Sequence, residues 1–276
     1  MELIVIGNDT DLAVRAIDAG VDRCLIDLES RGKLERQRRH HTFISDHSLA
    51  DVASMRTVLP PGALEVRVDA VHEGSRAQID AVVDAGADMV MAPMIESVTD
   101  AQTFVDLVAG RARTCLLVET VVGIGQLPAL VAVAGVDEVH IGLNDLMISR
   151  GADNLFSPLV DGSLDDPARL VRAAGLGLGI GGVTAPGVPG LPALPVDPDR
   201  LIGELVRLDV TLAWLGRSFR AAVAASGGDV TRCVRAIRDA ERHWRRCGPV
   251  ELAANHDHLV IEVERAAMSG HGNPTG

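Results

Sequence analysis

Two carboxylates of this chain lie where acidic side chains are costly to bury. Glu119 closes the apolar run that begins at Cys115, and Asp145 closes the run that begins at Val139. Runs of this length, rich in Val, Ile and Leu, are typical of parallel strands buried on both faces. A carboxylate at the end of such a strand needs a partner. Two of them predict a shared divalent cation, Mg²⁺ or Mn²⁺, because these ions prefer oxygen ligands.

A buried cation on another strand is the natural companion of these carboxylates. Arg67 lies in the apolar segment that starts at Glu65, and a guanidinium in such a place needs an anion. One reading is an internal ion pair with Asp27 or Glu29. The other is a bound substrate anion, which the end of a strand favours as a site of chemistry.

Alternating apolar segments and helical patterns indicate the elements that must position these residues. We expect strands over Leu3–Ile6, Arg23–Asp27, Glu65–Asp69, Asp88–Ala92, Thr114–Glu119, Glu138–Gly142, Leu176–Val183 and Thr211–Gly216, with a helical pattern after each. Eight such units predict an α/β protein with a closed (β/α)₈ TIM barrel. An open doubly wound sheet is the runner-up, but no GxGxxG follows the first strand.

Three long connections interrupt this rhythm after the second, sixth and seventh strands. They cover Arg31–His47, Ile148–Asp166 and Gly179–Pro198. In a barrel they crowd the catalytic face, where long loops are usually functional. We expect the barrel to span residues 1–247, a C-terminal helical extension to span 248–267 and a disordered tail to span 268–276.

Composition narrows the classes of partner. The formal net charge is -12, and the chain has 4 Phe, 2 Trp and no Tyr. A strongly acidic, aromatic-poor chain is a poor match for nucleic-acid backbones or stacked bases. No apolar stretch reaches the ~18 residues of a membrane span, so we expect neither a membrane span nor a signal peptide. The four cysteines show no CxxC spacing, so we expect a reduced, cytoplasmic protein.

The segments around the two carboxylates resemble one enzyme family. The chain reads Glu119-Thr-Val-Val-Gly-Ile-Gly-Gln-Leu-Pro and then Gly135-Val-Asp-Glu-Val-His-Ile-Gly-Leu-Asn-Asp-Leu, with Glu119 and Asp145 26 residues apart. Spacing and landmarks are similar to the HpcH/HpaI aldolase and citrate lyase β-subunit family of pyruvate-enolate enzymes. Ala19–Glu29, Glu65–Val68 and Ala85–Met94 also resemble its second, third and fourth strands, so the likeness covers most of the barrel.

The resemblance implies a function and a set of roles. Glu119 and Asp145 would hold the metal, Mg²⁺ or Mn²⁺, and Arg67 would bind the substrate or its enolate. The activity implied is that of a metal-dependent carbon–carbon lyase acting on a small 2-oxo acid. Family members assemble into oligomers, so a homo-oligomer is expected. Further expected substrate-binding residues are Glu29, Lys33, Gly142, Asn144 and Arg217.

One departure from the family puts the proton transfer in question. Where the bacterial aldolases carry a histidine after the acidic residue, this chain has Ser30, which cannot serve as a general base. Lys33, His40, His41 and His47 in the following basic loop are the substitutes. We favour His47, which lies near a helix start, and assign catalytic roles to Arg67, Asp27 and His47.

Two other functions stay open. The first is a CoA-ester lyase of the citrate lyase or malyl-CoA lyase type, in which Arg217 with Gly181 and Gly182 would bind a phosphate. The alternative role of Arg217 is an intersubunit salt bridge. The second function is a non-catalytic barrel that binds metal and 2-oxo acid but lost proton transfer with Ser30.

Overall fold

Eight parallel strands close into a barrel, as the sequence predicts. The computed structural model describes residues 1–31, 45–189 and 194–268. Each strand pairs with the next, and β8 pairs back onto β1. The strands are β1 Glu2–Ile6, β2 Arg23–Asp27, β3 Leu64–Arg67, β4 Met89–Ala92, β5 Arg113–Val118, β6 Glu138–Ile141, β7 Gly177–Val183 and β8 Leu212–Leu215.

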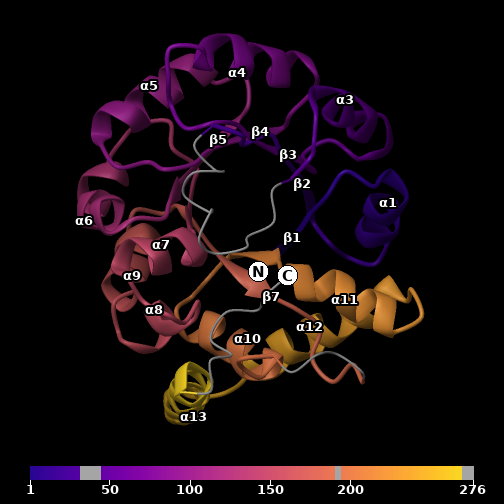
Figure 1. Cartoon of the computed structure of the whole chain (residues 1–276), viewed down its shortest axis with the longest axis vertical. Coiled ribbons are helices and arrows are strands. Elements are labelled where there is room, and N and C mark those ends of the chain that lie inside the picture. The colour runs from indigo at the N-terminus through magenta and orange to yellow at the C-terminus, as the bar shows by residue number, and fades with distance from the viewer. Residues whose placement is uncertain (32–44, 190–193, 269–276) are drawn as a thin grey trace.

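Helices surround the strands as an outer ring (Figure 1). They are α1 Thr10–Asp18, α3 Leu49–Val58, α4 Ser75–Asp84, α5 Val98–Val108, α6 Val121–Leu130, α7 Leu143–Arg150, α8 Ser157–Val160, α9 Asp165–Ala173, α10 Pro198–Arg207, α11 Arg217–Ala225, α12 Val230–Trp244 and α13 Pro249–Met268. Several begin at the residue types that satisfy free helix amides. Ser48 and Asp51, for example, form a capping box at the start of α3.

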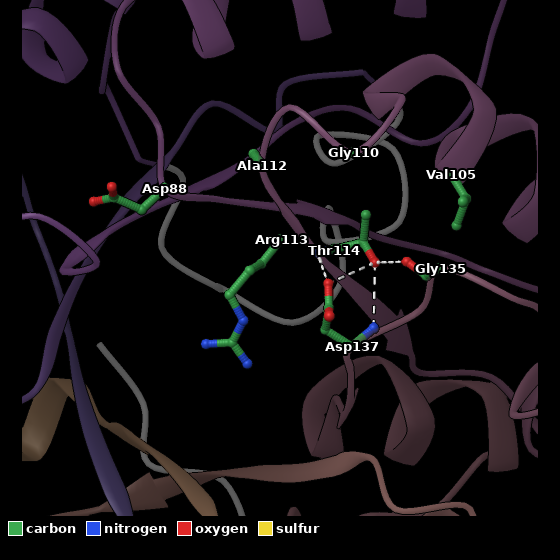
Figure 2. Close-up of a pocket in the computed structure, with 8 residues that line it drawn as sticks. All are labelled: Asp88, Val105, Gly110, Ala112, Arg113, Thr114, Gly135 and Asp137. Atoms are coloured by element: carbon green, nitrogen blue, oxygen red, sulfur yellow. Dashed lines mark hydrogen bonds between the residues drawn. The ribbon is translucent and has the colours of Figure 1, made fainter.

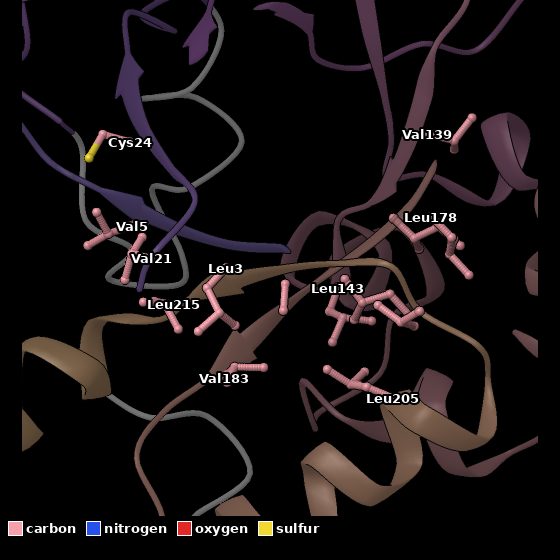
Figure 3. Close-up of a cluster of buried hydrophobic side chains, with 14 of the residues drawn as sticks. Leu3, Val5, Val21, Cys24, Val139, Leu143, Leu178, Val183, Leu205 and Leu215 are labelled. Atoms are coloured by element: carbon pink, nitrogen blue, oxygen red, sulfur yellow. The ribbon is translucent and has the colours of Figure 1, made fainter. Parts of the chain in front are cut away.

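The strands bury two different faces because side chains alternate along them. Outward residues such as Leu3, Val183 and Leu215 form one continuous core with the helices (Figure 3). Inward residues form a separate, smaller cluster made of Ile4, Leu25, Met89, Met91, Cys115, Leu117 and Leu212, with Ile6 and Trp214 against it. The barrel is therefore filled by side chains, and its chemistry must lie at an end of the strands.

The amino end of the barrel is plugged by charged side chains. Arg23 bridges the carboxylates of Glu65 and Glu138, at 3.3 and 3.0 Å, and also reaches Glu2. Arg113 adds a second guanidinium on Glu138 at 2.7 Å. This ionic plug is buried at its centre, since Glu65 is 0% exposed.

The C-terminal segment forms a long helix on the outside of the ring, beside α10 (Figure 1). Asn255 of α13 donates to the Arg200 carbonyl at 2.9 Å, which ties α13 to α10. Met268 still belongs to α13, so the expected tail cannot begin there. Residues 269–276 lie outside the described part. No helix within the described residues is long and apolar enough to cross a membrane.

Two connections differ from expectation. The segment Ile148–Asp166 contains the end of α7 and the short helix α8, because Phe156, Leu159 and Leu164 are buried in the core. The connection expected over Gly179–Pro198 begins only after Val183, because β7 spans Gly177–Val183, close to the strand expected over Leu176–Val183. Gly177, Gly179 and Gly181 occupy inward positions of this strand, where their neighbours are side chains of β6 and β8.

Candidate active site

The predicted site residues gather at the carboxyl rim of the barrel. Asp27 and Arg67 are the last residues of β2 and β3, and Glu119 follows β5 directly. Asp145 lies in the first turn of α7, three residues into the helix. The expectation that Asp145 closes a strand is therefore wrong. Strand β6 ends at Ile141, and Gly142 turns the chain into the helix that carries Asp145 inward of the rim.

Glu119 is held in a tight, buried position. Its side chain is 3% exposed, and its Oε1 accepts the Met94 amide at 3.1 Å. Met94 adopts the left-handed conformation, with a φ of 57°, which aims this amide at the carboxylate. A Cβ on Gly142 would lie 2.6 Å from the Glu119 Oε2 atom, so only glycine fits beside it.

Electrostatics indicate that Glu119 shares its site with Asp145. Burial raises the pKa of Glu119 well above its usual range, and the negative charge of Asp145 raises it further, whereas Arg67 opposes the rise. A divalent cation between the two carboxylates would reverse this balance, because it turns two repelling charges into two ligands. The donor chemistry, two carboxylates on separate elements, fits Mg²⁺ or Mn²⁺.

Protein ligands are few at this site. Across residues 1–31, 45–189 and 194–268, no group of three His, Cys, Asp or Glu side chains converges on a metal-sized centre. Glu119 and Asp145 would therefore be the two protein ligands that the sequence leads us to expect. Such a set leaves most positions on a hard cation for water and substrate oxygens.

Arg67 is paired within the protein. Its Nε and Nη2 donate to the two carboxylate oxygens of Asp27 at 2.8 and 2.7 Å, and Nη2 lies 3.5 Å from Glu29. Although burial disfavours the charge, these carboxylates hold the pKa of Arg67 above its usual range. The ion pair weighed in the sequence is thus present. No described residue accepts from Nη1, so that end of the fork can still donate to an anion.

His47 reaches the rim beside Asp27, where the sequence suggested a base. Its Nδ1 accepts the Asp27 backbone amide at 2.9 Å. This bond places the proton of the neutral ring on Nε2, and burial, the largest effect, lowers the pKa of His47. A ring in this state donates a hydrogen bond from Nε2 and has no lone pair left to accept a proton there. Ser45, two residues earlier, donates to Asp27 Oδ2 at 2.9 Å.

The remaining predicted residues are divided. Gly142 and Asn144 lie at the start of α7. The Gly142 amide donates to the Val118 carbonyl at 3.1 Å, whereas no side chain caps the first amides of the helix itself, so the amide of Asn144 can bind an anion. Arg217 begins α11 at the same rim and is exposed, and it forms no ion pair with another described residue. Lys33, His40 and His41 lie outside the described residues.

Three contributors escaped the sequence reasoning. Met94 and Ser45 act through local hydrogen bonds that residue types alone do not reveal. Trp214 lies within 5.5 Å of the Arg67 guanidinium carbon, measured to its ring centroid. A signal for Trp214 existed: glycines at alternate positions of β7 leave room for a large inward side chain on a neighbouring strand.

A cavity of about 480 Å³ lies at the opposite, amino end of the strands. Figure 2 shows Asp88, Arg113 and Asp137 around it, with Thr114 bonded to Asp137 and Gly135. These bonds fix the turns that lead into β5 and β6. Active sites of barrels lie at the carboxyl end, so this cavity is not the site described above.

Comparisons with known proteins agree with the geometry. A family model described as HpcH/HpaI aldolase/citrate lyase matches residues 2–156, more than half of the chain. A hydroxypyruvate/pyruvate aldolase of Pseudomonas aeruginosa is 30% identical over 139 residues, which cover 39% of this chain and 52% of that protein. The match thus spans about half of the relative's length. A 2-keto-3-deoxy-L-rhamnonate aldolase of Salmonella paratyphi B is 29% identical over 199 residues, 61% of this chain and 69% of that protein.

Solved structures give the same fold. An HpcH/HpaI aldolase from Desulfitobacterium hafniense superposes with a TM-score of 0.59 at 17% identity, covering 82% of this chain and 90% of that one. At this identity the likeness supports the barrel and nothing finer. The expected fold is confirmed, and the aldolase relatives support the expected lyase class.

Proposed function

The chain belongs to the HpcH/HpaI aldolase/citrate lyase family, and we propose that it is a carbon–carbon lyase that acts on a 2-oxo acid through its enolate. The observation that carries the proposal is the convergence of Glu119 and Asp145 at the rim that also holds Arg67. The charges of both Asp145 and Arg67 act on the buried Glu119 carboxylate, which supports a single site for the three side chains. Aldolase relatives over this part of the chain support the same class of reaction.

Glu119 and Asp145 are the residues that would hold Mg²⁺ or Mn²⁺. When bound there, a divalent cation supplies Lewis-acid polarisation of a ketone and stabilises the negative charge of an enolate. The two ionised carboxylates together carry a charge of about −2, which balances the charge of the cation. The substrate oxygens would complete the ligand set, because the described residues supply no third carboxylate or imidazole.

Arg67 and the start of α7 would bind the anionic end of the substrate. Nη1 of Arg67 is available, while Asp27 and Glu29 hold the rest of the guanidinium in place. The amides at the start of α7, near Gly142 and Asn144, face no side-chain cap and suit a carboxylate. Both features place positive charge where an enolate develops negative charge.

The reaction that these residues support is cleavage of a 4-hydroxy-2-oxo acid, or the reverse addition. A base removes the proton of the C4 hydroxyl, and the C3–C4 bond breaks to release an aldehyde. The bonding pair moves into the enolate of the 2-oxo acid, which takes a proton at C3. In its neutral state with Nδ1 engaged, His47 would donate a hydrogen bond to the aldehyde oxygen rather than remove the proton.

Replacing Glu119 by Gln tests the proposal. We expect the variant to lose Mg²⁺ binding and lyase activity together, because a neutral amide is a weak ligand for a hard cation. Glu96→Gln is the matched control, since Glu96 lies at the same rim but only accepts from the Thr120 hydroxyl at 2.6 Å. Calorimetric titration of Mg²⁺ and an assay with a panel of aldehydes and pyruvate give the readouts. Full activity in chelated protein would contradict the proposal.

The same assays separate the two alternatives. Tight, metal-dependent binding of oxalate without turnover on the aldol panel would assign the chain to non-catalytic binding. Turnover that appears only with CoA thioesters would assign it to the CoA-ester lyases. We propose in addition that the protein is cytoplasmic and that it forms a homo-oligomer. Sedimentation of the purified chain would test the oligomeric state.

A further inference from the structure

Three side chains from three strands follow one another into the barrel below the site. Arg67 of β3 lies with its guanidinium carbon 5.5 Å from the Trp214 ring centroid. Trp214 of β8 stacks on His140 of β6, with ring centroids 3.8 Å apart and an interplanar angle of 24°. Guanidinium, indole and imidazole thus form a column, called here the Arg67 column, that runs from the rim to the middle of the barrel.

Strand β7 makes room for this column by presenting only glycine inward. A Cβ at Gly179 would lie 2.1 Å from the His140 Nδ1 atom, which no packing tolerates. A Cβ at Gly181 would meet Trp214 at 3.6 Å. The imidazole of β6 therefore lies across the bare backbone of β7 and reaches the indole of β8. The alternating glycines of the sequence are the structural requirement for that contact.

His140 is suited to lie beside two cations because it carries no charge. Burial lowers its pKa well below the usual range, and the charges of Arg67 and Arg23 lower it further. Within the described residues, the two ring nitrogens of His140 have no hydrogen-bond partner. The indole Nε1 of Trp214 has none either. Ring packing, rather than a polar network, therefore fixes the orientation of both rings.

We propose that Trp214 is a positioning residue for Arg67, with His140 as the support that holds the indole in place. This role rests on the function proposed above, in which Arg67 binds the substrate anion. Asp27 fixes the Nε and Nη2 edge of the guanidinium, and the indole fixes the tilt of its plane. With both constraints, Nη1 keeps one direction, in which it can donate to the substrate anion. Without the indole, the guanidinium can rotate about its carboxylate partner.

Trp214→Leu and Trp214→Phe test this role together with His140→Phe. Loss of a desolvated cation–π contact corresponds to about tenfold in binding. We expect Trp214→Leu to weaken oxalate binding in saturating Mg²⁺ by about that factor, and to raise KM for the 2-oxo acid more than it lowers kcat. Trp214→Phe keeps an aromatic face and should stay within about threefold of the wild-type protein. His140→Phe keeps the stacking surface and should bind oxalate nearly as well.

Controls separate positioning from general damage. Mg²⁺ affinity should change little in these variants, because Glu119 and Asp145 are untouched. Circular dichroism melting should show that each variant is folded under the assay conditions. Oxalate binding by Trp214→Leu at wild-type strength, or equal losses in the Leu and Phe variants, would overturn the proposal. So would a His140→Phe loss confined to kcat, which would assign that ring to proton transfer. Absence of metal-dependent oxalate binding in the wild-type protein would overturn the proposed function itself, a distinguishable result.

Discussion

At the scale of single residues, the site depends on how closely Glu119 is confined. Its carboxylate lies between the Met94 amide and the bare Cα of Gly142, so it cannot move away from Asp145. Burial raises the pKa of Glu119, and repulsion from Asp145, which this confinement maintains, raises it further. A site that holds two carboxylates close together is preorganised to receive a cation.

Gly142→Ala should therefore weaken metal binding without unfolding the barrel. The new Cβ would lie 2.6 Å from Glu119 Oε2 and displace that oxygen. We expect Mg²⁺ affinity to fall by about tenfold to a hundredfold, the usual effect of disturbing the support of a ligand. Gly125→Ala is the matched control, since a Cβ there meets nothing within 4 Å. Equal Mg²⁺ affinity in both variants, measured by calorimetry, would contradict this view of Glu119.

A different kind of prediction concerns His47, namely whether its ring donates a hydrogen bond or acts as a base. His47→Gln can still accept the Asp27 amide through its oxygen and donate through its nitrogen, whereas His47→Leu can do neither. If His47 acts as a donor, the Gln variant should keep much of kcat, and the Leu variant should lose about a hundredfold. Because the pKa of His47 is lowered, its protonation should not limit the rate above pH 7. Equal, complete inactivation of both variants would indicate a base instead.

Much of this residue-scale account could be predicted. The position of Glu119 followed from where an apolar run stops, and the need of Arg67 for an anion followed from its place in a strand. The position of Asp145 did not, because its apolar run continues past the end of β6 into α7. The tautomer of His47 could not be predicted, because it depends on one backbone amide of a distant segment. The Met94 conformation is equally invisible, since nothing in a methionine favours a positive φ.

At the scale of elements, β7 contributes to the barrel interior by having glycine, and therefore no side chain, at its inward positions. Its inward glycines admit His140 and Trp214 from the strands on either side. The sequence predicted a strand over Leu176–Val183, which the structure confirms as Gly177–Val183, and also a connection from Gly179, which in the structure begins only after Val183. The two predictions overlapped because glycine is poor in strands by propensity, while close packing here requires it.

Gly179→Ala tests this reading of β7. The added methyl collides with His140, so the unfolding free energy should fall by about 1–3 kcal/mol, the range for overpacked cores. In the His140→Ala background, Gly179→Ala should lower the unfolding free energy by less than it does in the wild-type protein, because the side chain with which the methyl collides is gone. Denaturant unfolding of the four proteins completes the cycle. Strict additivity of the two changes would rule the contact out.

Most other elements followed from the sequence. The strand over Arg23–Asp27 matches the expectation at both ends, and the strand over Leu176–Val183 differs by one residue at its start. The helix α7 was missed because Leu143–Arg150 reads as the continuation of an apolar strand. Only the turn at Gly142 reveals the change of element, and that turn depends on the close approach of Glu119.

At the scale of the whole molecule, the barrel divides its charges between two ends. The carboxyl rim holds the catalytic candidates, and the amino end holds the ionic plug around Arg23. Burial raises the pKa of Glu65 in this plug to about 7, and Glu138 contributes, although Arg23 opposes the rise. The plug thus binds a proton near neutrality, far from the site of chemistry.

Glu65→Gln tests this linkage through stability. From pH 4.5 to 7 the folded state keeps a proton that the unfolded state releases, so the unfolding free energy should fall as pH rises through this window. For Glu65 alone the fall is about 3 kcal/mol. Glu65→Gln should remove that part of the slope and be the more stable protein at pH 8. Glu2→Gln, at the exposed edge of the same plug, should keep the slope. Identical slopes in wild type and Glu65→Gln would contradict the prediction.

The central claim is that Glu119 and Asp145 hold a cation that binds a 2-oxo acid enolate at the rim of this barrel. Calorimetric titration of oxalate, an analogue of that enolate, into the full chain tests it most directly, with and without saturating Mg²⁺. We predict binding that requires Mg²⁺ and disappears in Glu119→Gln, while Glu96→Gln binds as the wild-type protein does. Oxalate binding of equal strength in chelated protein, or undiminished binding by Glu119→Gln, would contradict the claim.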